Sequence, residues 1–194
     1  MPFAFEDWGV DVAISASQKC LMSSPGLAFA AVSDRAWHAR AASRLPHAYW
    51  DFDEIRQFVT KPRPQPPGTP PVHTVLQVTE ALRMMHEEGL DAVFRRHERM
   101  AIAARRGAAA LGLPMQCPLL KELATTVTAI ALPSGTSPLA VREAMRARGI
   151  ETAEGLGPYG ATAFRIGHMG DIRLDDVERT LAALAEALAE VRDG

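Results

Sequence analysis

Lys19 is the residue whose position gives the most direct access to chemistry. Residues 10–16 have the pattern of a buried or half-buried strand, a Pro-Gly turn follows at 25–26, and residues 27–32 have the pattern of the next strand. Lys19 is therefore expected at the carboxyl end of a strand, where α/β sheets present functional groups. A lysine amine with a free lone pair forms a Schiff base with an aldehyde there. The alternative is a solvated loop lysine.

The scarcity of lysine favours a specific role for Lys19. The chain carries 21 basic residues, and only Lys19, Lys61 and Lys121 are lysines. Arginine therefore provides most of the positive charge that keeps the chain in solution. A lysine between two apolar strands is then explained as well by amine chemistry as by solubility.

Arg165 is the second candidate for chemistry. It lies within the apolar run 163–167, where an unpaired guanidinium is costly to bury. A guanidinium in that setting can hold a carboxylate through two parallel hydrogen bonds. The alternative is an outward-facing arginine on an edge strand, paired with Asp171 or Glu178.

Four motifs, in order, resemble the class V pyridoxal-phosphate aminotransferases, and within them the alanine/serine–glyoxylate aminotransferase family. They are Asp-Trp-Gly-Val-Asp-Val at 7–12, Ser-Gln-Lys at 17–19, Pro-Gly-Leu at 25–27 and Phe-Arg-Ile-Gly-His-Met-Gly at 164–170. The resemblance covers essentially the whole chain. A lone Ser-Gln-Lys motif would be weak evidence for the family, whereas four motifs in the same order are strong evidence.

The resemblance implies an α/β fold in two parts. Residues 1–112 would form the C-terminal part of the PLP-binding large domain of a PLP-transferase type I fold, a mostly parallel sheet with helices, including the long connecting helix. Residues 113–194 would form a small C-terminal α/β sandwich domain. Family members are longer, and the resemblance implies that the N-terminal portion is missing. That portion would supply the phosphate-binding turn, the aromatic side chain on the pyridine ring and the aspartate on its nitrogen.

The resemblance also assigns roles to individual residues. Lys19 would hold the cofactor, pyridoxal 5′-phosphate, and act as the catalytic base and acid, and Arg165 would bind the substrate carboxylate. Gln18 would lie beside the cofactor phosphate, although a turn glutamine bonded to backbone is the alternative. Thr69 would reach the partner subunit's cofactor phosphate across a dimer. Pro66 stands where the family has a tyrosine, and capping of the next helix is an equal alternative for Thr69.

Three functions are compatible with these residues. The first is an aminotransferase that moves an amino group from alanine or serine to a 2-oxo acid such as glyoxylate or pyruvate, in a homodimer or with a partner chain that supplies the missing half. The second is another class V activity such as a lyase. The desulfurase and selenocysteine-lyase branch has histidine where this chain has Gln18, which argues against that function. The third is a non-catalytic remnant or dimerisation subunit.

Composition excludes several other classes. A net charge of -2 gives no electrostatic reason to expect nucleic acid or an anionic membrane as a partner. Cys20 and Cys117 are too few for a disulfide framework, and neither they nor the histidines have metal-ligand spacing. We expect no metal site. No apolar run approaches membrane-spanning length and the amino terminus lacks a signal pattern, so a cytoplasmic protein is expected.

Hydrophobic periodicity and breakers predict the order of elements along the rest of the chain. Six prolines in residues 61–71 exclude helix and central strand there. The predicted helices span residues 35–42, 51–59, 72–88, 91–111, 138–148 and 174–191, and the predicted strands span 125–131 and 161–166.

Overall fold

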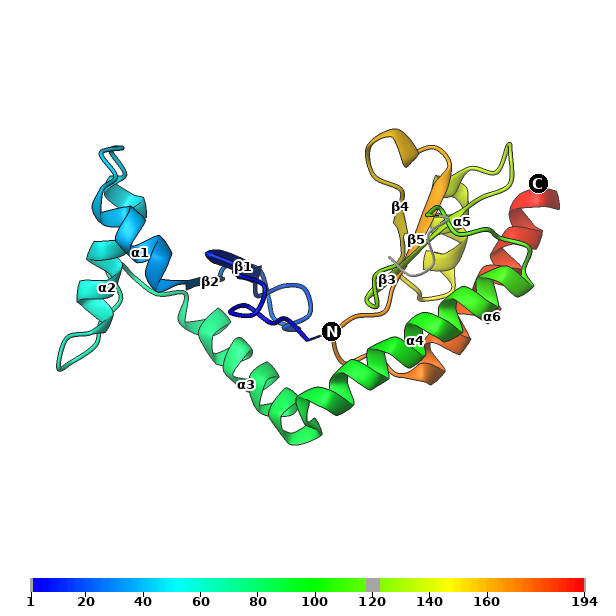
Figure 1. The fold of residues 1–194 in the computed structure, drawn as a ribbon. Coiled ribbons are helices and arrows are strands. Elements are labelled where there is room, and N and C mark those ends of the chain that lie inside the picture. Colours follow the sequence, from blue (N-terminus) through cyan, green and yellow to red (C-terminus); the bar gives the residue numbers. More distant parts are fainter. Residues whose placement is uncertain (1, 118–122, 194) are drawn as a thin grey trace. The chain divides into compact units, whose positions relative to one another are not determined.

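The computed structural model describes residues 2–117 and 123–193, which form a mixed α/β fold in two compact units (Figure 1). The first unit contains residues 2–84 and the second begins at residue 85. The boundary between them falls inside a helix. The expected division at residue 112 concerns the domains of a longer enzyme and stays a prediction.

The first unit begins with two short strands, β1 (Val12–Ala16) and β2 (Ala28–Val32). They pair antiparallel, with Val12 opposite Val32 and Ala16 opposite Ala28. The sequence pattern had placed both in a mostly parallel sheet. The connection between them contains no helix, and a parallel pair needs a long crossover, so these two strands can pair with each other only antiparallel.

Helices with well-formed amino caps follow the strand pair. Helix α1 (Asp34–Ala41) begins after Ser33, whose hydroxyl accepts a hydrogen bond from the Ala36 amide. A short 3-10 turn, η1 (Ala48–Trp50), leads to α2 (Phe52–Val59), where Asp51 accepts hydrogen bonds from two first-turn amides. Serine and aspartate favour these positions because they satisfy amides that lack a partner within the helix. The predicted helices at 35–42 and 51–59 are thus present.

Helix α3 (Val72–Glu88) leaves most of its large apolar side chains exposed. Its buried residues are Thr74, Val78 and Ala81. Of the apolar residues whose spacing predicts the helix, Val72, Val75, Leu76 and Leu82 are exposed, and Leu76 is 62% exposed. The spacing therefore identifies the helix correctly, while its apolar stripe finds no cover within the described residues.

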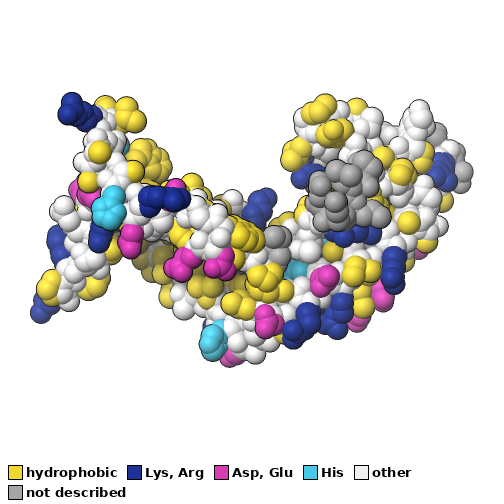
Figure 2. Space-filling view, viewed as in Figure 1, with side chains coloured by type: hydrophobic (Ala, Val, Ile, Leu, Met, Phe, Trp, Pro, Cys, Tyr) yellow, Lys and Arg dark blue, Asp and Glu magenta, His cyan; other side chains and the backbone are white. Residues whose placement is uncertain are grey.

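The β1–β2 pair is also apolar and exposed on both faces. Side chains alternate between the faces of a strand, so Ile14 lies on one face and Phe29, opposite Ser15, lies on the other. Ile14 is 79% exposed and Phe29 is 38% exposed. Figure 2 shows exposed hydrophobic side chains in this part of the chain. Apolar surface open on both sides of a sheet marks an interaction surface.

The second unit packs helices against a small antiparallel sheet. Helix α4 (Leu90–Ala110) is followed by β3 (Val127–Ala131), α5 (Pro138–Ala147), β4 (Ala153–Glu154), the 3-10 turn η3 (Gly157–Tyr159), β5 (Ala163–Gly167) and α6 (Leu174–Asp193). The strand order is β3-β5-β4, so β5 is central. The very short β4 was not predicted from the sequence.

The core of the second unit lies between the sheet and its helices. Ile130, Phe164 and Ile166 contribute from the strands and are almost fully buried. Helices α5 and α6 contribute Met145 and Leu184, which are also fully buried. Burial of each such side chain contributes about 2 kcal/mol.

A partly buried ion pair joins Glu88 at the end of α3 to Arg96 of α4, and the same guanidinium ties α4 to the loop after β5. The Arg96 guanidinium donates to both carboxylate oxygens of Glu88, at 2.7 and 2.8 Å, and its remaining nitrogen donates to the carbonyls of Gly170 and Ile172. The Arg96 guanidinium lowers the pKa of the Glu88 carboxyl. All three nitrogens of the buried guanidinium are satisfied, which is the condition for such a pair to persist.

Replacement of Arg96 is therefore expected to be costly. Arg96→Met leaves the Glu88 carboxylate with only Arg173, 3.9 Å away, and leaves two carbonyls without their donor, so we expect a loss of about 2 kcal/mol in the free energy of unfolding. The matched control is Arg146→Met, because the Arg146–Glu151 pair is 56% and 67% exposed and its loss costs less than about 1 kcal/mol. Urea titration of both variants measures the difference. Equal losses of stability in the two variants would show that the Arg96 contacts contribute no more than an exposed ion pair.

Candidate functional site

The loop that carries Lys19 is held by a buried hydroxyl at its start. Ser17, the first residue after β1, is fully buried. Its hydroxyl donates to the Ser24 carbonyl at 2.7 Å and accepts from the Leu27 amide at 3.3 Å. Within the loop, Met22 takes a left-handed backbone conformation with φ 55°. One side chain thus joins both ends of the loop and sets the path of the backbone on either side of Lys19.

Helix α3 fixes the far side of this loop. The Gln77 amide oxygen accepts from the Ser24 amide at 3.1 Å. Gly26 has φ 137°, and a β-carbon there would lie 3.3 Å from the Thr74 hydroxyl, so the loop approaches the helix closely. Sequence reasoning missed Thr74 and Gln77. The signal was present, since Thr74 is a polar residue on the buried side of α3, in line with Val78 and Ala81.

Lys19 and Gln18 project from this anchored loop into solvent. Both are exposed, and neither side chain forms a hydrogen bond or ion pair with any residue the structure describes. The backbone is fixed by Ser17 and Gln77, while the amine of Lys19 stays free to react. The loop therefore suits the aldehyde end of pyridoxal phosphate, which needs an accessible amine on a positioned backbone.

Thr69 lies exposed in the proline-rich segment that precedes α3. The first turn of α3 is bonded through the carbonyls of Pro70 and Pro71, and Thr69 makes no capping bond to it. The structure thus gives no support to the capping alternative for Thr69. It places Thr69 in the same unit as Gln18 and Lys19.

Arg165 lies on the central strand and faces away from the core. Phe164 and Ile166 point into the core, so by alternation Arg165 points to the opposite face. Its neighbours across the sheet are Ala129 on β3 and Ala153 on β4. Two alanines leave room around the half-buried guanidinium.

The guanidinium of Arg165 has no carboxylate partner in the described part of the chain. Its Nε donates to the Glu154 carbonyl at 2.6 Å, while the Glu154 carboxylate is paired with Arg142. Asp171 pairs with Arg173. The edge-strand alternative is therefore wrong for this structure, because β5 is central and neither acidic residue proposed for Arg165 binds it. Its two terminal nitrogens remain open to a carboxylate.

The predicted site residues fall in both units. Gln18, Lys19 and Thr69 belong to the first unit and Arg165 to the second. The described residues contain no cluster of three or more side chains able to hold a metal ion. None of the helices in the same ranges combines the length and apolar character needed to cross a membrane.

Comparison with known proteins gives several extended matches, although no family model matches the chain. The soluble hydrogenase small subunit of Synechococcus sp. (strain PCC 6716) is 38% identical, over 96% of this chain and 48% of that protein. L-aspartate–glyoxylate aminotransferase of Paracoccus denitrificans is 37% identical, over 89% of this chain and 43% of its own. The crystal structure of alanine–glyoxylate aminotransferase from Nostoc sp. matches with a TM-score of 0.89 at 29% identity, covering 97% of this chain and 50% of that chain.

Along nearly all of its length, the chain is similar to class V aminotransferases of the alanine/serine–glyoxylate group. The resemblance and the fold that the four motifs imply are thus confirmed. The chain spans about half the length of the relatives it matches.

His168, inside the last class V motif, is a packing histidine. It is fully buried, its Nε2 lies 2.9 Å from the Thr128 hydroxyl, and its amide donates to the Thr126 carbonyl. Burial lowers the pKa of His168 from 6.5 to about 4. The imidazole is therefore neutral at pH 7, and it lies on the core side of the sheet with Phe164 and Ile166, where it joins the end of β5 to β3.

This buried histidine should make stability depend on pH. Because its pKa in the folded chain is below that of the unfolded chain, the unfolded chain binds more protons between these values, and stability falls as the pH drops from about 6.5 towards 4. The loss is at most about 3 kcal/mol. Urea titrations at several pH values give the free energy of unfolding, which should change less with pH in His168→Gln than in the unmodified chain. His38→Gln, which replaces an exposed histidine, is the control. The same change with pH in His168→Gln and in the unmodified chain would contradict this.

Proposed function

We propose that this chain is the lysine-bearing part of a PLP-dependent aminotransferase that moves an amino group from a small amino acid, such as alanine or serine, to a 2-oxo acid such as glyoxylate or pyruvate. The observation that carries the proposal is the free amine of Lys19 on a loop anchored by Ser17. Four solved structures that match the chain at 27 to 31% identity are aminotransferases, which favours amino-group transfer over the hydrogenase names of two relatives.

Lys19 and Arg165 carry the two essential tasks. When bound, pyridoxal phosphate supplies an electron sink for the charge that develops at the substrate α-carbon. Lys19 would hold the cofactor through its side-chain amine and, once released, would serve as general base and then general acid for the proton on the substrate α-carbon. Arg165 orients the substrate by holding its carboxylate with its two open terminal nitrogens.

Gln18 and Thr69 have supporting roles in this proposal. Gln18 is exposed beside Lys19 and has a free amide to bind the cofactor phosphate. Thr69 is an exposed hydroxyl that reaches the phosphate held by a second subunit. Pro66 lies where the family has a tyrosine. Thr69 would therefore make this cross-subunit contact without a neighbouring tyrosine hydroxyl.

A complete site requires further polypeptide. The apolar β1–β2 pair and the exposed stripe of α3 lie open, and the relatives are about twice as long as the matched region. We propose that the polypeptide corresponding to the relatives' remaining half covers these surfaces, and that the complete assembly is a cytoplasmic homodimer. The described chain is expected to self-associate and to transaminate poorly when it lacks that half.

The first test locates the reactive amine. The chain is incubated with pyridoxal phosphate, reduced with borohydride and mapped by peptide mass spectrometry. We expect the pyridoxyl group on Lys19 and its loss in Lys19→Arg. Lys61→Arg is the control, because the Lys61 ammonium lies 4.0 Å from the centre of the Phe58 ring and is engaged there. Modification of Lys61, or of Lys121, which lies outside the described residues, with Lys19 unmodified would overturn the assignment.

The second test concerns the carboxylate-binding role of Arg165. In the assembled enzyme, Arg165→Lys should raise the KM for both the amino acid and the oxo acid about ten- to hundredfold, because lysine cannot donate two parallel hydrogen bonds. Cofactor binding should be unchanged. Arg146→Lys, on the surface of α5, is the matched control. An unchanged KM in Arg165→Lys would remove Arg165 from the site.

A further inference from the structure

The backbone carbonyl of Glu154 fixes the direction of the Arg165 side chain. Arg165 is paired with Ala153 on β4, and its Nε donates to the Glu154 carbonyl at 2.6 Å. A guanidinium can present two parallel donors either as Nε with one terminal nitrogen or as both terminal nitrogens. Because the carbonyl occupies Nε, a carboxylate can be held in parallel only by the terminal pair. The position of this carbonyl therefore determines where Arg165 can bind a substrate.

This carbonyl lies on the outer edge of the sheet. The Gly155 amide donates to the Ala163 carbonyl of β5, and main-chain groups alternate in direction along a strand, so those of Glu154 point away from β5. Strand β4 has only two residues and stands last in the strand order. No further strand of the described chain pairs with it. The main chain alone thus gives β4 little restraint.

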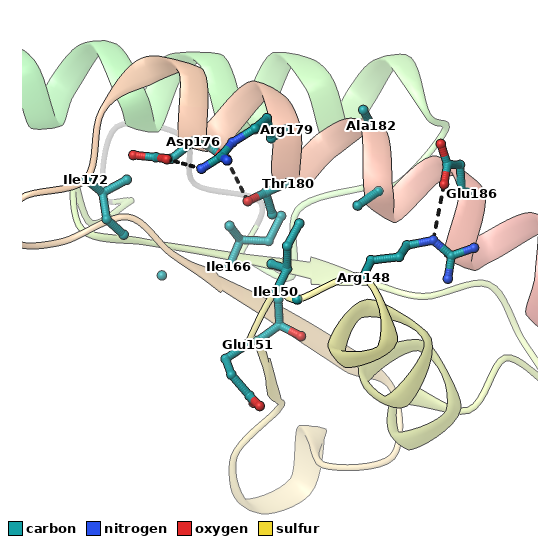
Figure 3. A pocket seen from close by; sticks show the side chains of 14 residues that line it. Arg148, Ile150, Glu151, Ile166, Ile172, Asp176, Arg179, Thr180, Ala182 and Glu186 are labelled. Atoms are coloured by element: carbon teal, nitrogen blue, oxygen red, sulfur yellow. Dashed lines mark hydrogen bonds and ion pairs between the residues drawn. The ribbon is translucent and has the colours of Figure 1, made fainter.

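The residues that lead into β4 border a pocket of about 620 Å³ (Figure 3). Glu151 and Thr152 line it on one side, and Thr180 and Ala183 of α6 line it on another. The open volume means that this segment does not pack closely on α6, and close packing is what fixes most segments of a protein core. Strand β4 must therefore be held in another way.

An ion pair to α5 provides that restraint. Glu154 is opposite Phe164, which faces the core, so the Glu154 side chain lies on the helix side of the sheet. There its carboxylate accepts from Nη1 of Arg142 on α5 at 2.8 Å. The Arg142 and Glu154 side chains are 32% and 34% exposed. Glu154 is thus bound at two points, through its carboxylate to Arg142 and through its carbonyl to Arg165.

Arg142 is the cation available for this contact. The arginines that follow it bind other carboxylates, since Arg146 is paired with Glu151 and Arg148 with Glu186. Figure 3 shows Arg148 extended toward Glu186 of α6. Within the described residues, the Glu154 carboxylate therefore depends on Arg142.

Stability alone gives a weak reason for this ion pair. The Arg142 Nε is inaccessible to solvent and has no hydrogen-bond partner among the residues that the structure describes. A buried donor without an acceptor costs free energy, whereas an apolar side chain at the same place would not. The placement of Glu154 beside Arg165 accounts for a guanidinium at this position.

We propose that Arg142 is a positioning residue for substrate binding, which acts through Glu154 on Arg165. The ion pair fixes β4, the Glu154 carbonyl fixes the Nε of Arg165, and the two terminal nitrogens then meet the substrate carboxylate end-on. This inference rests on the proposed function, which assigns the substrate carboxylate to Arg165.

The first experiment measures the anchor in the chain itself. Amide hydrogen exchange of Gly155, which donates to Ala163, reports on the pairing of β4 with β5. Arg142→Met should speed this exchange about five- to tenfold, because β4 loses a hydrogen bond between charged groups. Arg146→Met is the matched control, since the Arg146–Glu151 pair joins α5 to the same segment without contacting Arg165. Equal exchange in Arg142→Met and the unmodified chain would overturn the anchor.

The second experiment measures substrate binding in the assembled enzyme. Arg142→Met should raise the KM for both the amino acid and the oxo acid about three- to tenfold, because Arg165 loses its fixed direction. The kcat and the affinity for pyridoxal phosphate should be unchanged, because Lys19 lies in the other unit. Arg142→Lys should keep the KM within about twofold of the unmodified value, since the contact with Glu154 uses one nitrogen. Equal losses of kcat and cofactor affinity in Arg142→Met would indicate general structural damage and overturn the positioning role.

A double variant tests whether Arg142 acts through Arg165. Arg165→Lys removes the Nε that binds the Glu154 carbonyl, so Arg142→Met added to it should raise the KM further by less than about twofold. A further rise as large as that in the single variant would show that Arg142 acts independently of Arg165, and would overturn the inference.

The outcomes separate this inference from the proposed function. A raised KM in Arg165→Lys with an unchanged KM in Arg142→Met would overturn the positioning role and leave the proposed function standing. An unchanged KM in Arg165→Lys would overturn the substrate role of Arg165 and this inference with it, whatever the exchange rate of Gly155.

Discussion

The burial of Phe164 and Ile166 is the constraint on which the arrangement of the second unit depends. Both side chains fill the space between the sheet and its helices, and strand geometry then places Arg165 on the other face. A shift of one residue in register would bury the guanidinium and expose both apolar side chains, at a cost of several kcal/mol. The position of Arg165 is therefore maintained by the core and needs no ion pair of its own.

The Lys19 loop combines a fixed backbone with an exposed side chain. Its backbone is fixed by the buried Ser17 hydroxyl and by the Gln77 side chain of α3, whereas the Lys19 amine makes no contact with the described residues. The cofactor role proposed for Lys19 needs both properties, since binding a cofactor repeatedly at one point requires a fixed backbone and an accessible side chain. The hydrogen bonds that fix the loop backbone come from Ser17 and Gln77 and do not involve the Lys19 side chain.

Uncovered apolar surface distinguishes the first unit from the second. The second unit buries many of its hydrophobic side chains in two clusters, while Ile14 and the apolar stripe of α3 remain exposed in the first. Covering one such side chain is worth about 2 kcal/mol, so several together supply a strong driving force for association. The half-length match to the relatives gives this surface a physical explanation, because the uncovered strands and helix face are those that additional polypeptide would cover.

The sequence alone determined the fold class, the family and the position of almost every element. These follow from local signals, namely the cap residues Ser33 and Asp51, the prolines of residues 61–71, and motifs that depend on chain order. Only the tertiary structure decided which helix and strand faces are buried and how the strands pair. The apolar stripe of α3 is exposed, β1 and β2 pair antiparallel, the short β4 is present, and Arg165 lies on a central strand. Each of these depends on which segments distant in sequence come together, and periodicity along one segment does not contain that information.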